Sequence, residues 1–215
     1  MATAALVAAS PAGRPRRRRA GRPTAERILD AAERQFARHG YAGTSLGTIA
    51  AAVRIRVPSL YKHFTSKRQL FVAVLQRLLD PYVELLHRVL TVPTDPAEAE
   101  RNLVAVMTHY LETPNLARLI QHAALAGGEP LRLVVDRWYA PLFRRAAELA
   151  APSPGPGDDA LALVVAFHSM MSGYVTMAAL HARLTGGDPL GREGKAAQLG
   201  LMSELARHVW EMHPR

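Results

Sequence analysis

Apolar residues recur every three or four positions along most of the chain, the spacing that places them on one face of an α-helix. Alternating β-branched stretches bounded by hairpin turns are missing from the sequence, so we expect an all-α protein. The pattern predicts helices near residues 24–39, 46–53, 58–64, 67–90, 95–112, 114–126, 130–150, 158–184 and 193–212.

Capping and helix-breaking residues divide this pattern. Ser66 with Gln69 forms a capping-box pattern at the start of the helix predicted over 67–90. Pro81 lies inside that helix and is expected to kink it, because proline lacks an amide donor and clashes with the preceding turn. The segment 152–157, rich in proline and glycine, is expected to separate the last two helices from the rest.

The segment from Thr44 to Phe64 has the layout of a helix-turn-helix, with two short helices joined by a tight turn. Thr44 or Ser45 can cap the first helix, and Pro58 can open the second, where no amide donor is needed. Leu60 and Phe64 lie four residues apart and should hold the second helix from within. The outward face then carries donors suited to phosphates and base edges, which are Ser59, Tyr61, Lys62 and His63. A generic αα-hairpin has the same layout.

Net positive charge is confined to the first third of the chain. Residues 1–23 carry six arginines and no acidic residue, and residues 24–68 carry eight basic and three acidic side chains. Residues 69–215 have a net charge of −2, so a strongly basic head is followed by a near-neutral body. This distribution is typical of a protein that binds a polyanion through one end, and a solvated basic tail without a partner is the alternative. Residues 1–23 are expected to be disordered when free.

Several other classes of protein are disfavoured. The chain has no cysteine, which excludes disulfides, thiolate metal sites and cysteine nucleophiles. No apolar stretch reaches the roughly 20 residues that a membrane-spanning helix needs, and the opening segment has its charges after its apolar residues, unlike a signal peptide. We therefore expect a cytoplasmic protein with no membrane partner. The nine histidines lack metal-ligand spacing, and no nucleophile elbow or Walker-type loop occurs, so we expect no enzyme, metal or cofactor.

One combination of sequence fragments is specific. The chain contains Thr24-Ala-Glu-Arg-Ile-Leu-Asp-Ala-Ala, Gly40-Tyr41, Thr44-Ser45, Ile49-Ala50 and Pro58-Ser-Leu-Tyr-Lys-His-Phe with Ser66-Lys67. Together these fragments resemble the TetR family of one-component bacterial regulators over about residues 24–71. The resemblance implies a disordered basic arm (1–23), a helix-turn-helix DNA-binding domain (24–70) and a helical domain for ligand binding and dimerisation (71–215).

The resemblance also implies roles for individual residues. Tyr61 and Lys67 would lie on backbone phosphates, and Thr44 would touch phosphate through its hydroxyl and the helix N-terminal amides. The sequence departs from the family at Arg54, where the turn usually contains glycine. A positive φ there costs about 1 kcal/mol, so the turn is expected to be slightly reshaped. Arg54 either reaches a phosphate or is a solvated turn residue. The candidate DNA-contacting residues are Thr44, Ser45, Arg54, Arg56, Val57, Pro58, Ser59, Tyr61, Lys62, His63 and Lys67.

Members of the family act as homodimers, so the resemblance implies that the operator is palindromic. It also implies that a small hydrophobic or aromatic effector releases the protein from this operator. The last two helices are the candidate dimer interface, through Leu161, Val164, Val165, His168, Met171, Leu199, Met202, Leu205 and Val209, about half of which are expected to be intrachain core. The candidate effector pocket contains Tyr110, His122, Trp138, Tyr139, Phe167, Met171 and Tyr174. The sequence leaves open a nonspecific nucleic-acid-binding dimer and, less favoured, a helical enzyme without a recognisable motif.

Overall fold

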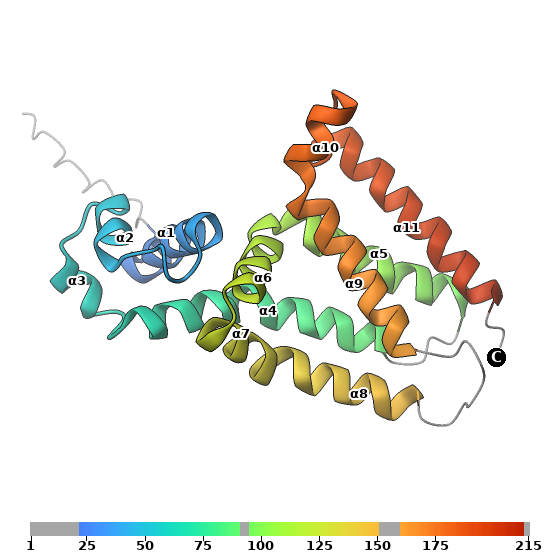
Figure 1. Ribbon diagram of the computed structural model, residues 1–215, viewed down its shortest axis with the longest axis horizontal. Helices are drawn as coiled ribbons and strands as arrows, with labels where there is room; N and C mark the ends of the chain where they lie inside the picture. Colours follow the sequence, from blue (N-terminus) through green and yellow to red (C-terminus); the bar gives the residue numbers. More distant parts are fainter. Residues whose placement is uncertain (1–21, 91–94, 151–159, 213–215) are drawn as a thin grey trace, which may run out of the picture.

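The computed structural model describes residues 22–90, 95–150 and 160–212, and every regular element within those ranges is helical. Figure 1 shows a small head at the left and a larger body at the right, connected by one long helix. The head consists of α1 (Thr24–His39), α2 (Leu46–Ala52) and α3 (Val57–Tyr61), and the long helix is α4 (Lys67–Leu90). The body is completed by α5 (Pro96–Glu112), α6 (Pro114–Ala126), α7 (Gly128–Val134), α8 (Ala140–Ala150), α9 (Ala160–Thr176), α10 (Ala178–Thr185) and α11 (Arg192–Met212). The all-α prediction is confirmed.

Helix ends follow the predicted capping chemistry closely. α1 ends at His39, and Gly40 follows it with a φ of 68°, a left-handed conformation that glycine adopts without a steric cost. At the start of α4, Ser66 Oγ accepts a hydrogen bond from the amide of Gln69 (3.0 Å), and Gln69 Oε1 accepts one from the amide of Thr65 (2.6 Å). The capping-box prediction is confirmed, with Gln69 reaching one residue further back than expected.

Two segments predicted as continuous helices are interrupted. The segment 130–150 contains α7, a π-helical turn η1 (Val135–Tyr139) and α8. The segment 158–184 contains α9 and α10, which are separated at Met177. Apolar spacing is nearly the same on both sides of such breaks, so periodicity does not reveal them. α4 continues through Pro81.

The body is built around α4 and α5. α11 lies along α5 in the most extensive helix pair of the described chain, and α9 packs against α5, α6 and α8 (Figure 1). Within the described ranges no helix has both the length and the apolar content needed to span a membrane. The breaker predicted over 152–157 lies outside the described residues.

A polar network holds the head against the body. Arg77 of α4 pairs with Asp30 of α1 (2.8 Å) and with Glu33 of α1, and Glu33 also accepts a hydrogen bond from Asn115 of α6 (2.8 Å). Each ionised side chain of this network is less than one-third exposed, so its interactions are only partly screened by water. Three helices, α1, α4 and α6, therefore meet at Glu33 and Arg77.

Candidate functional site

The helix-turn-helix presents a polar outer surface on an apolar support. Leu60 is fully buried and Phe64 is 8% exposed, which confirms the prediction that these two residues anchor α3 from within. Tyr61, Lys62 and His63 follow Leu60 and are all exposed, and the Tyr61 ring retains 49% of its accessible surface. Tyrosine presents an apolar ring and a hydroxyl, so an exposed tyrosine can make both apolar and hydrogen-bonding contacts. The outer side of this turn is therefore available for contact with another molecule.

The turn between α2 and α3 keeps its left-handed residue even though glycine is absent. Arg54 has a φ of 58°, and it is the one non-glycine residue with positive φ in the described part of the chain. Its amide donates to the carbonyl of Ala51 (3.0 Å), and the amide of Ile55 donates to that of Ala50 (3.0 Å). These bonds close the end of α2, so the backbone accepts the strain at Arg54 rather than reshaping the turn. The Arg54 side chain is exposed.

Thr44 and Ser45 have different roles. Ser45 is exposed and caps α2, its Oγ accepting from the amide of Thr48 (3.0 Å). Thr44 is buried, with its hydroxyl within hydrogen-bond distance of the carbonyl oxygens of Gln35 (3.1 Å) and Gly40 (2.8 Å). The Thr44 hydroxyl is therefore committed to the fold, which corrects the expectation that it touches phosphate. Ser45 is the exposed polar residue at the start of α2.

Lys67 is directed toward the loop after α1. Its ammonium lies 4.5 Å from the centre of the Tyr41 ring and 3.4 Å from the carbonyl oxygen of Ala42, to which it donates. Burial lowers the pKa of the Lys67 ammonium from its usual value. A phosphate contact by Lys67 would thus compete with interactions that it already makes inside the head.

The three acidic residues of the head are all paired with arginines. Arg22 pairs with Glu26 (3.4 Å) and Asp30 (2.7 Å), while Arg77 pairs with Asp30 and Glu33. The helix-turn-helix cations have no acidic partner within the described ranges; they are Arg54, Arg56 and Lys62. Because the acidic residues of the head are neutralised elsewhere, these cations keep their positive charge for a polyanion. The arm arginines before Arg22 lie outside the described residues.

The body contains a second concentration of polar chemistry, here called the buried polar cluster. It consists of Tyr82 of α4, His109 and Tyr110 of α5, Tyr139 of η1 and His168 of α9. The Tyr110 ring meets the Tyr82 ring edge-on at 4.9 Å, and the His168 ring lies 5.4 Å from that of Tyr139. Tyr82 Oη lies 3.5 Å from His168 Nδ1. Four separate elements thus bring hydroxyl and imidazole groups to one place.

Burial keeps the cluster uncharged at neutral pH. It raises the pKa of Tyr110 to about 12 and holds the pKa values of Tyr82 and Tyr139 well above 10. It also lowers the pKa values of His109 and His168 below the usual value of 6.5. All five side chains are therefore neutral hydrogen-bonding groups.

Sequence reasoning found part of this cluster. Tyr110 and Tyr139 belong to it, and Trp138 and Met171 are buried beside it in the same core, with Trp138 Nε1 donating to Asp80 Oδ1 (2.6 Å). Phe167 is half-buried against that core. The sequence did not identify Tyr82, His109 or His168 as members of this cluster. His168 was predicted for the dimer interface instead. A polar aromatic residue within an apolar helical stretch was the available signal, but it does not specify which helices meet.

Two other pocket candidates, Tyr174 and His122, lie apart from the buried polar cluster. The Tyr174 hydroxyl donates to the carbonyl oxygens of Pro189 (2.8 Å) and Gly194 (3.1 Å), so it closes the loop between α10 and α11. His122 faces the head, where a Cβ added to Gly40 would lie 3.3 Å from His122 Nδ1. Neither side chain is directed into the buried polar cluster.

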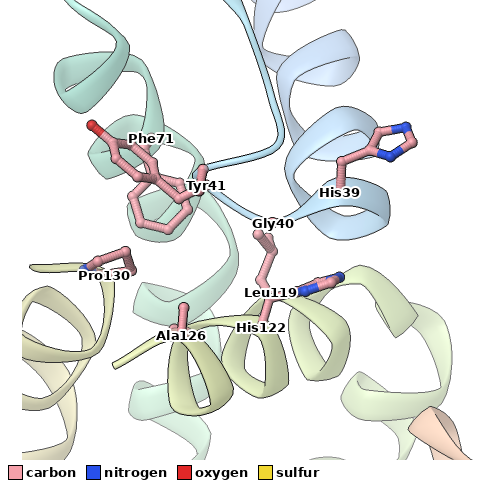
Figure 2. A pocket seen from close by; sticks show the side chains of 10 residues that line it. His39, Gly40, Tyr41, Phe71, Leu119, His122, Ala126 and Pro130 are labelled. Atoms are coloured by element: carbon pink, nitrogen blue, oxygen red, sulfur yellow. The ribbon is translucent and has the colours of Figure 1, made fainter. Parts of the chain in front are cut away.

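His122 lines a small cavity of about 110 Å³ where the head meets α6. Figure 2 shows the Tyr41 and Phe71 rings on one side of it, with Ala126 and Pro130 facing them. Arg68 and Glu129 form an ion pair of 2.6 Å that links the start of α4 to α7. This joint is mainly apolar and has room for little more than a few water molecules.

The last helices leave an apolar surface uncovered. His168, Met171 and Met202, predicted for a dimer interface, face the core of their own chain. Exposed large apolar side chains lie on α9, α10 and α11 or at the junction of α9 with α10, and these are Val165, Met177, Leu180, Leu184 and Leu201. Five of the eight exposed large apolar side chains in the described ranges therefore come from the last three helices or the junction between them.

Comparison with known proteins agrees with this geometry. Residues 28–74 match the family model described as bacterial regulatory proteins, tetR family. Over 97 residues the chain is 33% identical to the HTH-type transcriptional repressor SCO4008 of Streptomyces coelicolor, covering 45% of this chain and 47% of that protein. Over 85 residues it is 35% identical to the HTH-type transcriptional activator FasR of Mycolicibacterium smegmatis, covering 40% of this chain and 39% of that protein.

These matched stretches span less than half the length of either curated relative. A similarity over most of the chain comes from structure. The crystal structure of Mycobacterium smegmatis AmtR superposes with a TM-score of 0.61 and 26% identity, covering 89% of this chain and 88% of that one. The fold therefore extends the similarity from the head into the body.

Proposed function

Because the chain belongs to the tetR family of bacterial regulatory proteins, we propose that it is a repressor that binds a palindromic DNA operator as a homodimer and releases it when a small molecule binds in the body. The observation that carries the DNA-binding part is the division of α3 into two sides. Leu60 and Phe64 are buried while Tyr61, Lys62 and His63 are exposed. The exposed side chains supply donors for phosphates and base edges in the major groove.

The proposed DNA surface extends from α3 to its neighbours. Pro58 is exposed and Val57 and Ser59 are half-exposed at the start of α3, where they would meet base edges. Arg54, Arg56 and Ser45 lie in the adjoining turn and at the start of α2, where they would contact phosphates on either side. Lys67 would join them by exchanging its contact with the loop after α1 for a phosphate.

Dimerisation follows from the size of the recognition element. One short helix reads only a few base pairs, so specificity requires two copies about one helical turn of DNA apart, or a small multiple of that spacing. The exposed apolar side chains of α9, α10 and α11 would form the two-fold interface, with Val165, Leu180 and Leu201 among them. The partner subunit would cover this surface.

Release requires the effector to favour one conformation over another, because equal affinity for both shifts nothing. The effector site we propose is the buried polar cluster, which includes Tyr82 of α4. The same helix carries Arg77 about one turn earlier, paired with Asp30 and Glu33 of the head. A displacement of α4 at Tyr82 would therefore move the head directly and change the separation of the two α3 helices.

The test is a binding measurement on DNA from the chain's own upstream region. The wild-type protein is expected to protect a palindromic site of about 10–25 base pairs, and Tyr61→Ala with Lys62→Ala is expected to weaken binding to it at least tenfold. Arg145→Ala is the matched control, because it removes a positive charge from an exposed position on α8. Uniform protection along the fragment would indicate a nonspecific DNA-binding protein. Unchanged operator affinity in a folded double variant would contradict the proposal.

A further inference from the structure

We propose that the effector is an uncharged, flat molecule that carries both a hydrogen-bond donor and an acceptor, and that it is held by the hydroxyls of Tyr110 and Tyr139 and the imidazole of His109. This inference rests on the proposed function and specifies the ligand of the site assigned there.

The first reason is that these three groups lack partners. Tyr110 Oη, Tyr139 Oη and His109 Nε2 are buried and make no hydrogen bond of normal geometry with any described residue. The hydroxyls of Tyr82 and Tyr139 lie near enough to that of Tyr110 for weak hydrogen bonding to act on its pKa, which leaves most of the hydrogen-bonding capacity of these groups unused. Buried polar groups are nearly always paired in folded proteins, because desolvation without a hydrogen bond is unfavourable. Phenylalanine in place of either tyrosine would fill the same space without this cost. Three unpaired groups in one cluster therefore indicate groups that are kept for a ligand.

The second reason is the local helix geometry. Tyr139 lies at the end of η1, and π-helical turns are rare and occur often at functional sites. On the facing helix, Tyr82 directly follows Pro81, which leaves one backbone carbonyl of α4 without its usual amide donor. Both irregularities adjoin the buried polar cluster and interrupt the regular hydrogen-bond pattern of their helices there.

The third reason is electrostatic, and it selects the charge of the ligand. The cluster contains no charged side chain, since its tyrosines and histidines are neutral at pH 7. The nearby carboxylate of Asp80 is already hydrogen-bonded to Trp138, and Glu112, which acts electrostatically on His109, is exposed. An ion would be buried there without a counter-charge, which is strongly unfavourable. A neutral molecule meets no such penalty.

The rings and polar groups of the cluster select the shape and polarity of the ligand. The rings of Tyr82, Tyr110, Tyr139 and Phe143 favour an aromatic molecule that can lie against them. A tyrosine hydroxyl both donates and accepts, whereas the His109 imidazole is hydrogen-bonded to the Leu78 backbone and its unpaired Nε2 offers an acceptor. An aromatic amide or a compound of similar polarity complements this set.

The experiment uses three probes of equal size that differ in charge, namely benzamide, benzoate and benzamidinium. Each is added at millimolar concentration to the full-length protein at pH 7.5, and the Tm is measured. Benzamide is expected to raise the Tm, and the two ions to leave it unchanged, because a ligand stabilises only the state that it binds. A shift with either ion as large as that with benzamide, or no shift with benzamide, would overturn the proposal.

Tyrosine-to-phenylalanine variants test the proposal through the Tm of the protein without ligand, which should rise for the unpaired hydroxyls and fall for a paired one. Tyr110→Phe and Tyr139→Phe each remove an unpaired hydroxyl, so each is expected to raise the Tm of the protein without ligand by about 2–4 °C and to abolish the benzamide shift. Tyr174→Phe is the matched control. The Tyr174 hydroxyl makes hydrogen bonds to two backbone carbonyl oxygens (2.8 and 3.1 Å), so this variant is expected to have a lower Tm and to keep the benzamide shift. Phenylalanine variants that are less stable without ligand would show that the two hydroxyls have structural partners.

Operator binding by the same proteins separates the two proposals. Tyr174→Phe is expected to bind the operator with wild-type affinity and to be released by benzamide like the wild type, whereas benzamide is expected to release Tyr110→Phe less than either. A wild-type benzamide shift without operator binding would refute the proposed function alone. Operator binding with no preference for benzamide over the two ions would refute the ligand class alone.

Discussion

Asn115, at the start of α6, donates a hydrogen bond of 2.8 Å to Glu33 on α1, across the boundary between body and head. The other carboxylate oxygen of Glu33 is paired with Arg77 of α4. The head is thus held by two body helices that converge on one carboxylate. Any rearrangement that separates α6 from α4 must break one of these interactions, so Glu33 couples the two helices to the orientation of α1.

Removing Arg77 is expected to destabilise the protein more than removing an exposed arginine. Arg77→Ala leaves Asp30 and Glu33 partly buried without their cation, which is expected to lower the free energy of unfolding by about 1–3 kcal/mol. Arg145→Ala breaks an exposed ion pair with Glu148 and is expected to change the free energy of unfolding by less than about 0.5 kcal/mol. Urea denaturation of both variants measures the difference, and equal effects would contradict the role of the network.

Glycine at position 54 is expected to stabilise the head. Arg54 has a φ of 58°, and Arg54→Gly relieves the steric cost, raising the free energy of unfolding by about 0.5–1 kcal/mol. Arg56 has extended backbone (φ −82°), so Arg56→Gly relieves no strain and increases the entropy of the unfolded chain. Denaturation should therefore show changes of opposite sign. Operator binding should weaken in both variants, because each removes a cation near DNA; unchanged binding by Arg54→Gly would assign Arg54 as a solvated turn residue.

Two glycines of the head are expected to respond oppositely to alanine. Gly40 combines a φ of 68° with the His122 ring 3.3 Å from an added Cβ, so Gly40→Ala is expected to cost at least about 1 kcal/mol. Gly47 lies inside α2, where an added Cβ meets only Ser45 Oγ at 3.6 Å. Gly47→Ala is expected to stabilise the protein by about 0.5–1 kcal/mol, because alanine is the better helix former. Thermal unfolding distinguishes them, and a neutral Gly40→Ala would place His122 further from the head.

The buried histidines are expected to make stability depend on pH. Burial lowers the pKa of His168 in the folded protein, so the unfolded chain, with a pKa near 6.5, takes up a proton that the folded protein resists. The stability contributed by neutral His168 is complete above about pH 6.5 and is lost as the pH falls through that value toward the folded pKa. Denaturation between pH 7.5 and 5 should thus show a shallower decline for His168→Gln than for the wild type. Parallel curves would mean that His168 accepts its proton freely in the fold.

The basic arm is expected to contribute affinity for DNA through charge. Residues 1–20 carry five arginines and no acid. Deleting them should weaken operator binding and reduce the slope of log affinity against log salt by close to one unit for each phosphate that the arm neutralises. Titrations at several salt concentrations measure that slope, and an identical slope in the shortened protein would show that the arm does not bind phosphates.

The sequence by itself determined the helices and the head. Local rules act there over three to seven residues, so the capping pair Ser66 and Gln69, the terminator Gly40 and the anchors Leu60 and Phe64 could all be read directly. The sequence also located the unusual turn residue Arg54, but its expectation of a slightly reshaped turn was wrong, because the backbone keeps a φ of 58° there. Charge counting also located the basic end without any structure.

Only the tertiary structure decided which distant side chains meet. The buried polar cluster draws Tyr82, Tyr110, Tyr139 and His168 from four separate elements, and it separates them from His122 and Tyr174, which have similar polarity. Helical periodicity specifies which side of a helix is apolar, but the partner across that side depends on the crossing angle and axial register of each helix pair. Those quantities arise from the packing of the whole body, and one added residue in the π-turn η1 is enough to rotate Tyr139 relative to α7.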